Sequence, residues 1–336
     1  MKKIIYFFLS LLTAFPISLR LSGFRVLLFF LLFSNCLLPT CGFAQQLALS
    51  NQYAVNRFSL SPAYAGTGEA FEIFGSYRNE WVNVPEAPES KVVSANGLVC
   101  KNMGLGGTIS SFQAGIFENL SASVSYAYHA KLSGEHMLSF GLGVGMLESR
   151  INIAGASAQS DPVAANNRDV HSMGIDMGFG ILYRYKALHL GLALPRMTNS
   201  MVKDVNGKTV FTYSMQQGFN IGYKFSLNND WAIDPIAKVS MVKDASLFYE
   251  LAIPIIYKKK IWLSPAYKKT DIAIAVGGMP YSNFIVNYSY EFSSTGIMGR
   301  SGGTHEIIVG WKMTAKKRSE TPEHDSKKPY LDWILK

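Results

Sequence analysis

The chain has 336 residues, of which 48% are apolar, 13% are aromatic and 16% are charged, with a formal net charge of +9. Soluble domains carry about 25% charged residues, so the low charge argues against an ordinary cytosolic enzyme. The mean hydropathy of +0.11 argues against a disordered chain. The composition therefore indicates a folded protein, part of whose surface does not face water.

The first 44 residues predict a secretory signal peptide. They carry four basic residues, no acidic residue and two apolar runs, at 4–15 and 26–33. Gly42 and Ala44 are small residues at the −3 and −1 positions, which predicts cleavage before Gln45. Two alternatives stay open. One is a retained anchor, although neither run reaches the roughly 18–20 residues that span a bilayer, and the other is acylation at Cys41.

The mature chain from Gln45 onward offers little for metal, disulfide or nucleic-acid chemistry. Its only cysteine is Cys100, so it has no intramolecular disulfide and no thiolate metal site. Subtracting the four basic residues of the leader from 32 leaves 28 basic against 23 acidic residues, a net charge of +5. This excess is scattered and forms no basic stripe. We therefore expect no cofactor, no metal site and no nucleic-acid partner.

Beyond residue 45 the dominant pattern is alternation with a period of two. Between 120 and 132 the even positions are apolar, and the odd positions are small or polar. The same sorting recurs at 138–146, 174–185, 219–225 and 284–292. A strand sorts alternate residues onto two faces, whereas a helix would scatter them. An exported chain that enters a membrane with such strands must close them into a barrel, because lipid leaves no partner for free backbone groups.

We therefore predict an all-β fold, a transmembrane antiparallel β-barrel of the outer-membrane type, over residues 70–313. A soluble β-sandwich is the alternative, but one uniformly apolar face would leave it poorly soluble. An even strand number places both ends of the barrel wall on the periplasmic side. The fourteen predicted strands are 70–80, 92–101, 103–112, 119–131, 136–150, 172–186, 188–195, 210–227, 230–241, 246–258, 260–269, 271–278, 283–293 and 304–313.

The predicted connections also follow the asymmetry of outer-membrane barrels, which have short periplasmic turns and longer outer loops. Two connections, near 243–244 and 269–270, are short where the rule requires long ones. Aromatic residues gather near predicted strand ends, which is typical of the girdles at the membrane interface. The tight connections are at 101–102, 132–135, 187, 228–229 and 259, and the long ones are at 81–91, 152–171, 196–209 and 294–303.

No residue constellation predicts catalysis. His129 and His136 flank a predicted turn with Glu135 between them, but they lack the helical spacing of a zinc motif. His171 lies beside a long loop without a nucleophile elbow. The glycine-rich runs 104–107 and 141–145 alternate as strands, so they indicate close packing or curvature of the wall rather than phosphate binding. We expect a protein that is not an enzyme.

The sequence between 52 and 146 resembles the PorP/SprF family of type IX secretion system membrane proteins from Bacteroidetes. This family typically opens with a tyrosine and an asparagine, continues with Asn-Pro-Ala-Tyr-Ala-Gly, and ends a strand with Tyr-Arg-x-x-Trp before a proline-containing loop. Ser61 stands where the family usually has asparagine. The matching residues, which are candidate contacts of a partner or of a plug, are Tyr53, Asn56, Pro62, Ala63, Tyr64, Ala65, Gly66, Tyr77, Arg78 and Trp81.

The resemblance implies a noncatalytic outer-membrane barrel that takes part in type IX secretion or gliding motility. Its implied role is to link the machinery to periplasmic components, or to support the export and anchoring of a specific surface adhesin. The implied partners are outer-membrane lipid, secretion or gliding components, one large adhesin and a periplasmic peptidoglycan-associated protein. A porin or a hydrophobic-substrate channel is the alternative, since a barrel of this strand number would accommodate either function.

Residues 45–69 are predicted to form a periplasmic or plug-like segment ahead of the barrel. Pro62 fixes one backbone dihedral and Gly66 permits a left-handed conformation, which fits a rigid turn before the first strand. Such a run can contact a partner or serve a structural role alone.

Two further expectations concern charged residues. Arg78 lies opposite the apolar face of the first predicted strand and should point into the lumen, where we predict a structural ion pair with Glu72 or Glu80. Residues 314–336 are predicted to form a basic periplasmic tail. The apolar end of this tail either docks on a partner or frays.

Overall fold

The computed structural model describes residues 50–68, 71–151, 170–198, 201–203, 209–242, 247–269, 271–281, 283–293 and 301–313. The predicted signal peptide at 1–44 and the predicted tail at 314–336 lie outside these described residues. No helix in the described part of the chain is long and apolar enough to cross a membrane.

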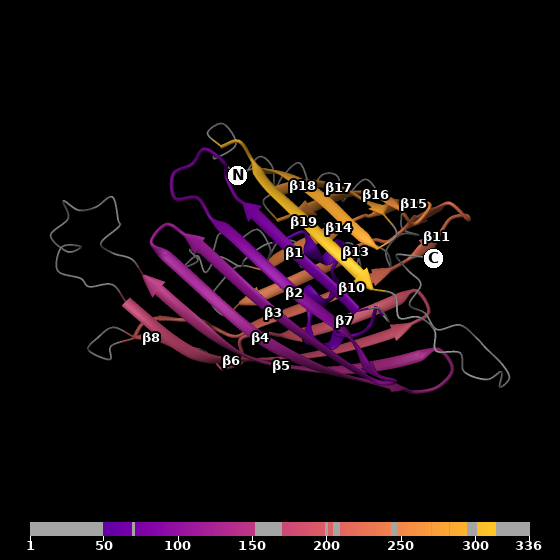
Figure 1. The fold of residues 1–336 in the computed structure, drawn as a ribbon, viewed down its shortest axis with the longest axis horizontal. Coiled ribbons are helices and arrows are strands. Elements are labelled where there is room, and N and C mark those ends of the chain that lie inside the picture. The colour runs from indigo at the N-terminus through magenta and orange to yellow at the C-terminus, as the bar shows by residue number, and fades with distance from the viewer. Residues whose placement is uncertain are drawn as a thin grey trace, which may run out of the picture. The chain divides into compact units, whose positions relative to one another are not determined.

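Most of the described residues from 71 onward form one closed antiparallel sheet (Figure 1). Successive crossings of the wall pair with each other, and β1 pairs with β19, so the sheet has no free edge. The strands of the first half are β1 (Phe71–Asn79), β2 (Glu89–Cys100), β3 (Met103–Ala114), β4 (Phe117–Lys131), β5 (His136–Ile151), β6 (Val170–Tyr185) and β7 (Leu188–Leu194).

The second half of the wall contains three strands that are each interrupted once. Counted as single crossings, β10/β11, β12/β13 and β14/β15 reduce the 17 strands of the sheet to 14. Pro235 and Pro254 lie at two of the interruptions, where a missing N–H cannot pair. The elements are β10 (Gln216–Tyr223), β11 (Phe225–Ser226), β12 (Trp231–Ile233), β13 (Ile236–Val242), β14 (Phe248–Ala252), β15 (Ile255–Tyr257), β16 (Ile261–Lys268), β17 (Asp271–Tyr281), β18 (Phe284–Ser293) and β19 (Thr304–Met313).

The predicted fold class and strand number are therefore confirmed, and the soluble sandwich is wrong because the sheet closes on itself. Most predicted boundaries lie within three residues of the observed ones, but one is wrong by six. The strand expected at 210–227 begins at Gln216, because β9 (Thr209–Thr212) pairs instead with β8 (Met201–Lys203) in a separate two-stranded sheet. Alternation marks a strand but does not say which partner it pairs with.

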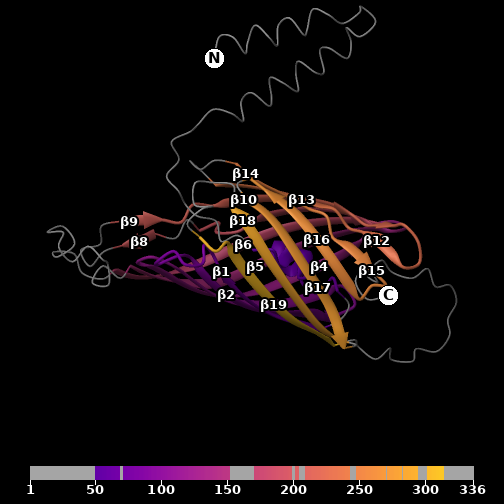
Figure 2. The ribbon, with the colours of Figure 1, turned by 90° about the horizontal axis from the view of Figure 1, so that it is seen from above.

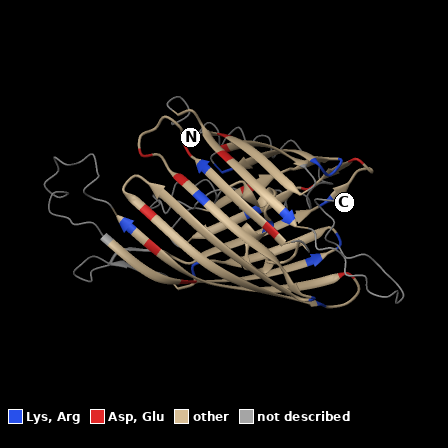
Figure 3. Cartoon of the chain, in the orientation of Figure 1, with Lys and Arg blue, Asp and Glu red and all other residues tan. Residues whose placement is uncertain are grey.

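The two faces of the wall differ in the way that the alternation predicts. The side chain of Val124 on β4 points outward and is 69% exposed, whereas Ser139 on β5 points inward and is fully buried. Charged residues are sparse along the strands (Figure 3). An outward band of exposed apolar side chains is the surface that a bilayer covers.

The connections divide the barrel into two ends. At the end that we call the turn end, the described connections are tight, as at 101–102, 132–135, 186–187, 227–230 and 258–260. At the opposite end, which we call the loop end, the connections include 80–88, 195–215 and 294–303. The connection at 115–116 is a third short one at the loop end, beyond the two that the sequence indicated. By the usual rule the turn end faces the periplasm.

Candidate functional site

A segment ahead of the first strand lies inside the barrel, and we call residues 50–67 the lumenal segment. It consists of three short 3-10 helices, η2 (Gln52–Ala54), η3 (Arg57–Leu60) and η4 (Pro62–Tyr64). Figures 1 and 2 show its indigo coil among the strands. It contacts residues all round the wall, from β1 and β2 through β10 to β18 and β19. The lumen is therefore occupied by the protein's own chain.

The lumenal segment runs from the loop end to the turn end. At its start, the Ser50 hydroxyl donates to Glu306 Oε1 at 2.5 Å, and Glu306 is the third residue of β19 after the long connection 294–303. At its far end, Gly66 N donates to Asn96 Oδ1 at 3.0 Å, close to the tight turn at 101–102. The chain then enters β1 from the turn end, so the segment passes through the length of the lumen.

The second half of the lumenal segment lies against glycines of β3, β5 and β6. A Cβ added at Gly141 would lie 2.1 Å from the backbone nitrogen of Ala63, and one at Gly104 would lie 2.0 Å from the carbonyl oxygen of Ala65. At Gly180 it would lie 1.9 Å from Ser61 Oγ. Non-bonded atoms repel strongly at such distances, so a side chain at these positions would force the wall or the segment to shift. These glycines therefore make room for the backbone of the segment.

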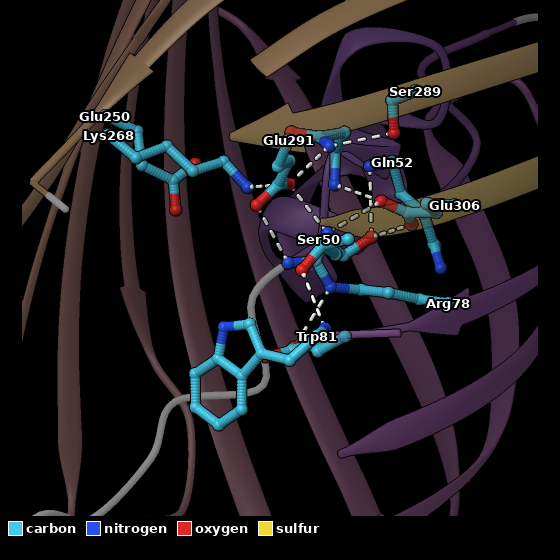
Figure 4. A network of polar contacts seen from close by, with 12 residues as sticks. Ser50, Gln52, Arg78, Trp81, Glu250, Lys268, Ser289, Glu291 and Glu306 are labelled. Carbon is cyan, nitrogen blue, oxygen red and sulfur yellow. Dashed lines mark hydrogen bonds and ion pairs between the residues drawn. The ribbon is translucent and has the colours of Figure 1, made fainter. Parts of the chain in front are cut away.

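The first half of the lumenal segment contacts a buried ionic cluster at the loop end (Figure 4). Arg78 Nη1 donates to Glu291 Oε1 at 2.6 Å and Nη2 to Glu291 Oε2 at 3.0 Å, while Lys268 Nζ donates to Glu291 Oε1 at 2.5 Å. Asn51 joins the cluster, with its backbone N–H on Glu306 Oε2 at 2.8 Å and its side chain on Glu291 Oε1 at 2.7 Å. Such charges tolerate burial because they are paired and hydrogen-bonded.

The predicted ion pair between Arg78 and Glu80 is present, but Arg78 makes only one hydrogen bond to Glu80 and two to Glu291. Arg78 points into the lumen, and its Nε donates to Glu80 at 3.0 Å. Glu72 instead pairs with Lys312 of β19 at 2.8 Å, since it lies near the other end of β1. Burial raises the pKa of the Glu80 carboxyl, although Arg78 acts in the opposite direction. Glu80 therefore takes up a proton at a higher pH than an exposed glutamate does.

A second polar group lies towards the turn end. Arg57 Nη2 of the lumenal segment donates to Asp234 Oδ2 at 2.8 Å, with both side chains buried. Its Nη1 lies 3.1 Å from His189 Nε2, which must accept because a guanidinium can only donate. Asp234 sits at the interruption between β12 and β13, where its N–H donates to the carbonyl of Pro254.

A cavity of about 480 Å³ opens beside this group at the turn end. Its wall includes Arg57 and Tyr64 of the lumenal segment, Arg184 of β6, and Lys224 and Lys259 near the turns. Five basic residues and three acidic ones line it. Among the residues that the structure describes, no group of three or more histidines, cysteines, aspartates or glutamates could hold a metal ion.

The structure brings seven of the ten sequence-predicted site residues into the lumenal segment. Tyr53 and Asn56 are buried, and Asn56 Nδ2 donates to Ser94 Oγ at 2.9 Å. Tyr64 Oη donates to Asn220 Oδ1 at 2.6 Å. Gly66 has a φ of +72°, so the left-handed conformation expected there is present. The other three, Pro62, Ala63 and Ala65, are the residues that lie over the glycines of the wall.

The remaining three predicted residues belong to the end of β1 and its connection. Arg78 is the centre of the ionic cluster. Tyr77 points outward, is 40% exposed and donates to Glu89. Trp81 follows the strand, and its backbone N–H donates to Thr304 Oγ1 at 3.3 Å. These two residues therefore do not contact the lumenal segment in any described hydrogen bond.

Sequence reasoning missed the residues that complete both polar groups. Glu291, Glu306 and Lys268 complete the loop-end cluster, and Arg57 and Asp234 form the turn-end pair. A signal for Glu291 was available, because it alternates with outward aromatic residues in 283–293 and is thus an inward carboxylate that requires a cation. That Glu291 pairs with Arg78 depends on closure of the barrel, so this pairing could not be predicted from the sequence.

Solved structures that resemble the chain are outer-membrane barrels. The toluene transporter TbuX of Ralstonia pickettii is 10% identical, with 76% of this chain and 92% of that chain covered and a TM-score of 0.48. The P. putida toluene transporter TodX is 12% identical, with 79% and 94% covered and a TM-score of 0.46. A FadL homologue of Pseudomonas aeruginosa is 8% identical, with 81% and 95% covered and a TM-score of 0.46.

The sequence comparisons point to one family. No curated protein matches the chain. The model of the family described as type IX secretion system membrane protein PorP/SprF matches residues 42–311, which include the lumenal segment and almost the whole barrel wall. This match covers far more than half of the chain. The chain therefore belongs to the PorP/SprF family of type IX secretion system membrane proteins, with an outer-membrane β-barrel fold.

Proposed function

We propose that the chain is a noncatalytic component of the type IX secretion or gliding machinery in the outer membrane. In this role it links the machinery to periplasmic components, or it supports the export and anchoring of a specific surface adhesin. Outer-membrane lipid, secretion or gliding components, one large adhesin and a periplasmic peptidoglycan-associated protein are the partners that this role requires. Family membership supports the proposal, since the family is one of secretion-system membrane proteins.

The observation that carries the proposal is the occupied lumen. An open, water-filled porin needs a free bore. Here the lumenal segment contacts strands around the wall and is held by one buried ion pair, between Arg57 and Asp234, and by buried hydrogen bonds. Displacing it would separate buried charges from their partners, which is costly. A barrel built in this way is suited to holding a fixed shape for partners at its two ends.

Affinity purification tests the proposal directly. The protein is tagged, extracted from its own outer membrane in a mild detergent, and the accompanying proteins are identified by mass spectrometry. We expect stoichiometric recovery of secretion or gliding components, or of one large adhesin. A barrel that is reproducibly recovered alone overturns the proposal.

Planar-bilayer conductance separates the proposal from its rival, a porin or hydrophobic-substrate channel. We expect the refolded protein to be silent, because the lumenal segment closes the bore. A stable open conductance of the unmodified protein would favour the rival. The Gly141→Ala variant, in which a methyl group collides with the segment, tests in the same assay whether disturbing the segment opens the bore.

A further inference from the structure

Among the described residues, three lysines each lie over the ring of a tyrosine on the outer face of the barrel wall. An ammonium group over an aromatic face is attracted by the electrons of the ring, so the charge is held beside it. One pair lies at the loop end and two lie at the turn end. Measured from Nζ to the ring centroid, the pairs are Lys91 with Tyr77 at 5.8 Å, Lys186 with Tyr185 at 5.4 Å and Lys258 with Tyr257 at 5.4 Å.

The nearest carboxylate distinguishes the three lysines. Lys91 Nζ lies 2.6 Å from a carboxylate oxygen of Glu89, which compensates its charge. The next lysine along the chain, at 186, has a carboxylate at the limit of ion-pair distance, 4.0 Å away. Lys258 is exposed, and none of the carboxylates that the structure describes forms an ion pair with it. Its charge is therefore the one that a ligand can still compensate.

The surface beside Lys258 is apolar and faces outward. Trp231 is the cross-strand partner of Tyr257, with ring centroids 4.7 Å apart, and it is 43% exposed. Ile261 is the partner of Tyr257 on the other side and is 56% exposed. Ile256 is buried, so the adjacent Tyr257 points away from the lumen. A cation thus borders a row of outward rings and aliphatic carbons at the turn end of the apolar band.

The backbone of this turn does not itself call for lysine. Lys260 N donates to the carbonyl of Tyr257 at 3.0 Å, and the two residues between them, Lys258 and Lys259, have φ values of +45° and +58°. Asparagine and glycine are the residues that adopt this left-handed turn readily, and other side chains are strained in it. Lys258 N also donates to the carbonyl of Asp230 at 2.6 Å, which holds the turn against the neighbouring one. The position of the ammonium group is thus fixed by a turn that other residues would form more easily.

The combination of charge and apolar surface narrows the class of ligand. An inorganic anion would gain nothing from Trp231 and Ile261, and an acidic protein segment would have to enter the bilayer to reach them. Aromatic rings with a polar edge and snorkelling lysines occupy the level of the lipid headgroups. A phospholipid with a net negative charge contacts both kinds of surface at once, because its phosphate and its acyl chains lie at these two levels.

We propose that Lys258, Tyr257 and Trp231 form a binding site for an anionic phospholipid in the leaflet at the turn end. The phosphate contacts the ammonium group of Lys258, and the upper part of an acyl chain packs against Trp231 and Ile261. The inference goes beyond the proposed role in secretion and does not depend on it, since it concerns the lipid around the barrel.

Native mass spectrometry of the full-length refolded barrel in detergent tests the inference. The probes are dioleoyl-phosphatidylglycerol and, as a reference with the same acyl chains and no net charge, dioleoyl-phosphatidylcholine. We expect the anionic lipid to be retained in preference to the neutral one, and the preference to fall as salt is raised, because ions screen exposed charges. Lys258→Gln should lower the ratio of the two retained lipids about fivefold, the effect of one basic side chain at an anionic surface.

Two further variants separate charge from structure. Lys258→Arg keeps the charge and should retain the preference of the unmodified protein. Lys91→Gln makes the same chemical change in the loop-end pair, where Glu89 already compensates the lysine, and should leave the ratio unchanged. Heat-modifiable migration on gels checks that each variant keeps its barrel.

Four outcomes would overturn the inference. They are equal retention of the two lipids by the unmodified protein, equal losses in Lys258→Gln and Lys91→Gln, loss of the preference in Lys258→Arg, and displacement of the anionic lipid by inorganic phosphate at the same concentration. The last outcome would identify a simple anion site. If Lys258→Gln leaves lipid retention unchanged but lowers the recovery of a periplasmic protein in the co-purification, the turn docks a protein and the lipid site is wrong.

Discussion

The two halves of the lumenal segment are held by different physical means. Residues 58–66 are held mainly by shape, since glycines of β3, β5 and β6 leave space for their backbone, and two hydrogen bonds, from Tyr64 to Asn220 and from Gly66 to Asn96, add to this. Residues 50–57 are held by charge and hydrogen bonds, through Glu291, Glu306 and Asp234. Close packing against a glycine is disrupted when a methyl group is added, whereas an ionic or hydrogen-bonded contact is lost when the charged or polar group is removed. The comparison thus predicts which kind of substitution each half tolerates.

The largest expected effect comes from removing the shared carboxylate of the ionic half. Glu291→Ala leaves Arg78 and Lys268 buried beside each other without the oxygen atoms that both contact. We expect a loss of about 3–5 kcal/mol in the free energy of unfolding, because a buried charge loses its partner. Urea unfolding in detergent, followed by tryptophan fluorescence, measures it.

The matched control for this substitution lies at the same end of the barrel. Glu89→Ala removes a carboxylate that pairs with the exposed Lys91 at 2.6 Å, and exposed pairs contribute little. We expect its unfolding midpoint to stay at the unmodified value. Equal losses in the two variants would show that the ionic half is not held by its buried charges.

The next effect comes from adding one methyl group to the glycine-lined half. Gly141→Ala places a Cβ 2.1 Å from Ala63 N, so the wall or the segment must move, at a cost of about 1–3 kcal/mol. We expect faster trypsin cleavage after Arg57 and the appearance of conductance. Gly178→Ala on the neighbouring strand is the control, because its Cβ would meet its nearest atom at 3.7 Å. A silent, protected Gly141→Ala barrel would contradict the role of shape.

The smallest effect concerns one hydrogen bond between the segment and the wall. Tyr64→Phe removes the donor to Asn220, and both residues are buried, so we expect a loss of about 1–2 kcal/mol in stability. Thermal unfolding in detergent measures the change. Tyr77→Phe makes the same chemical change at an exposed hydroxyl, which donates to Glu89, and should leave the melting temperature where it is. A similar fall in melting temperature in both variants would show that the buried hydrogen bond of Tyr64 contributes no more to stability than the exposed one of Tyr77.

Much of the barrel was predictable because its information is local. Alternation along 120–132 and 284–292 identifies the strands and the face that meets lipid, and the turn lengths identify the two ends. The inward direction of Arg78 also followed from alternation alone. The glycines at 104 and 141 could be recognised as close-packing positions, although the backbone that they accommodate could not be named.

The sequence by itself determined the fold class, the strand number and the inner and outer faces, since each depends on residues next to one another in the chain. Only the tertiary structure decided that residues 50–67 pass through the lumen, and that Arg78 meets Glu291, which lies 213 positions away. Closure of the sheet between β1 and β19 brings these residues together. A charged side chain takes whichever partner the closed wall places beside it, and no local pattern specifies that neighbour.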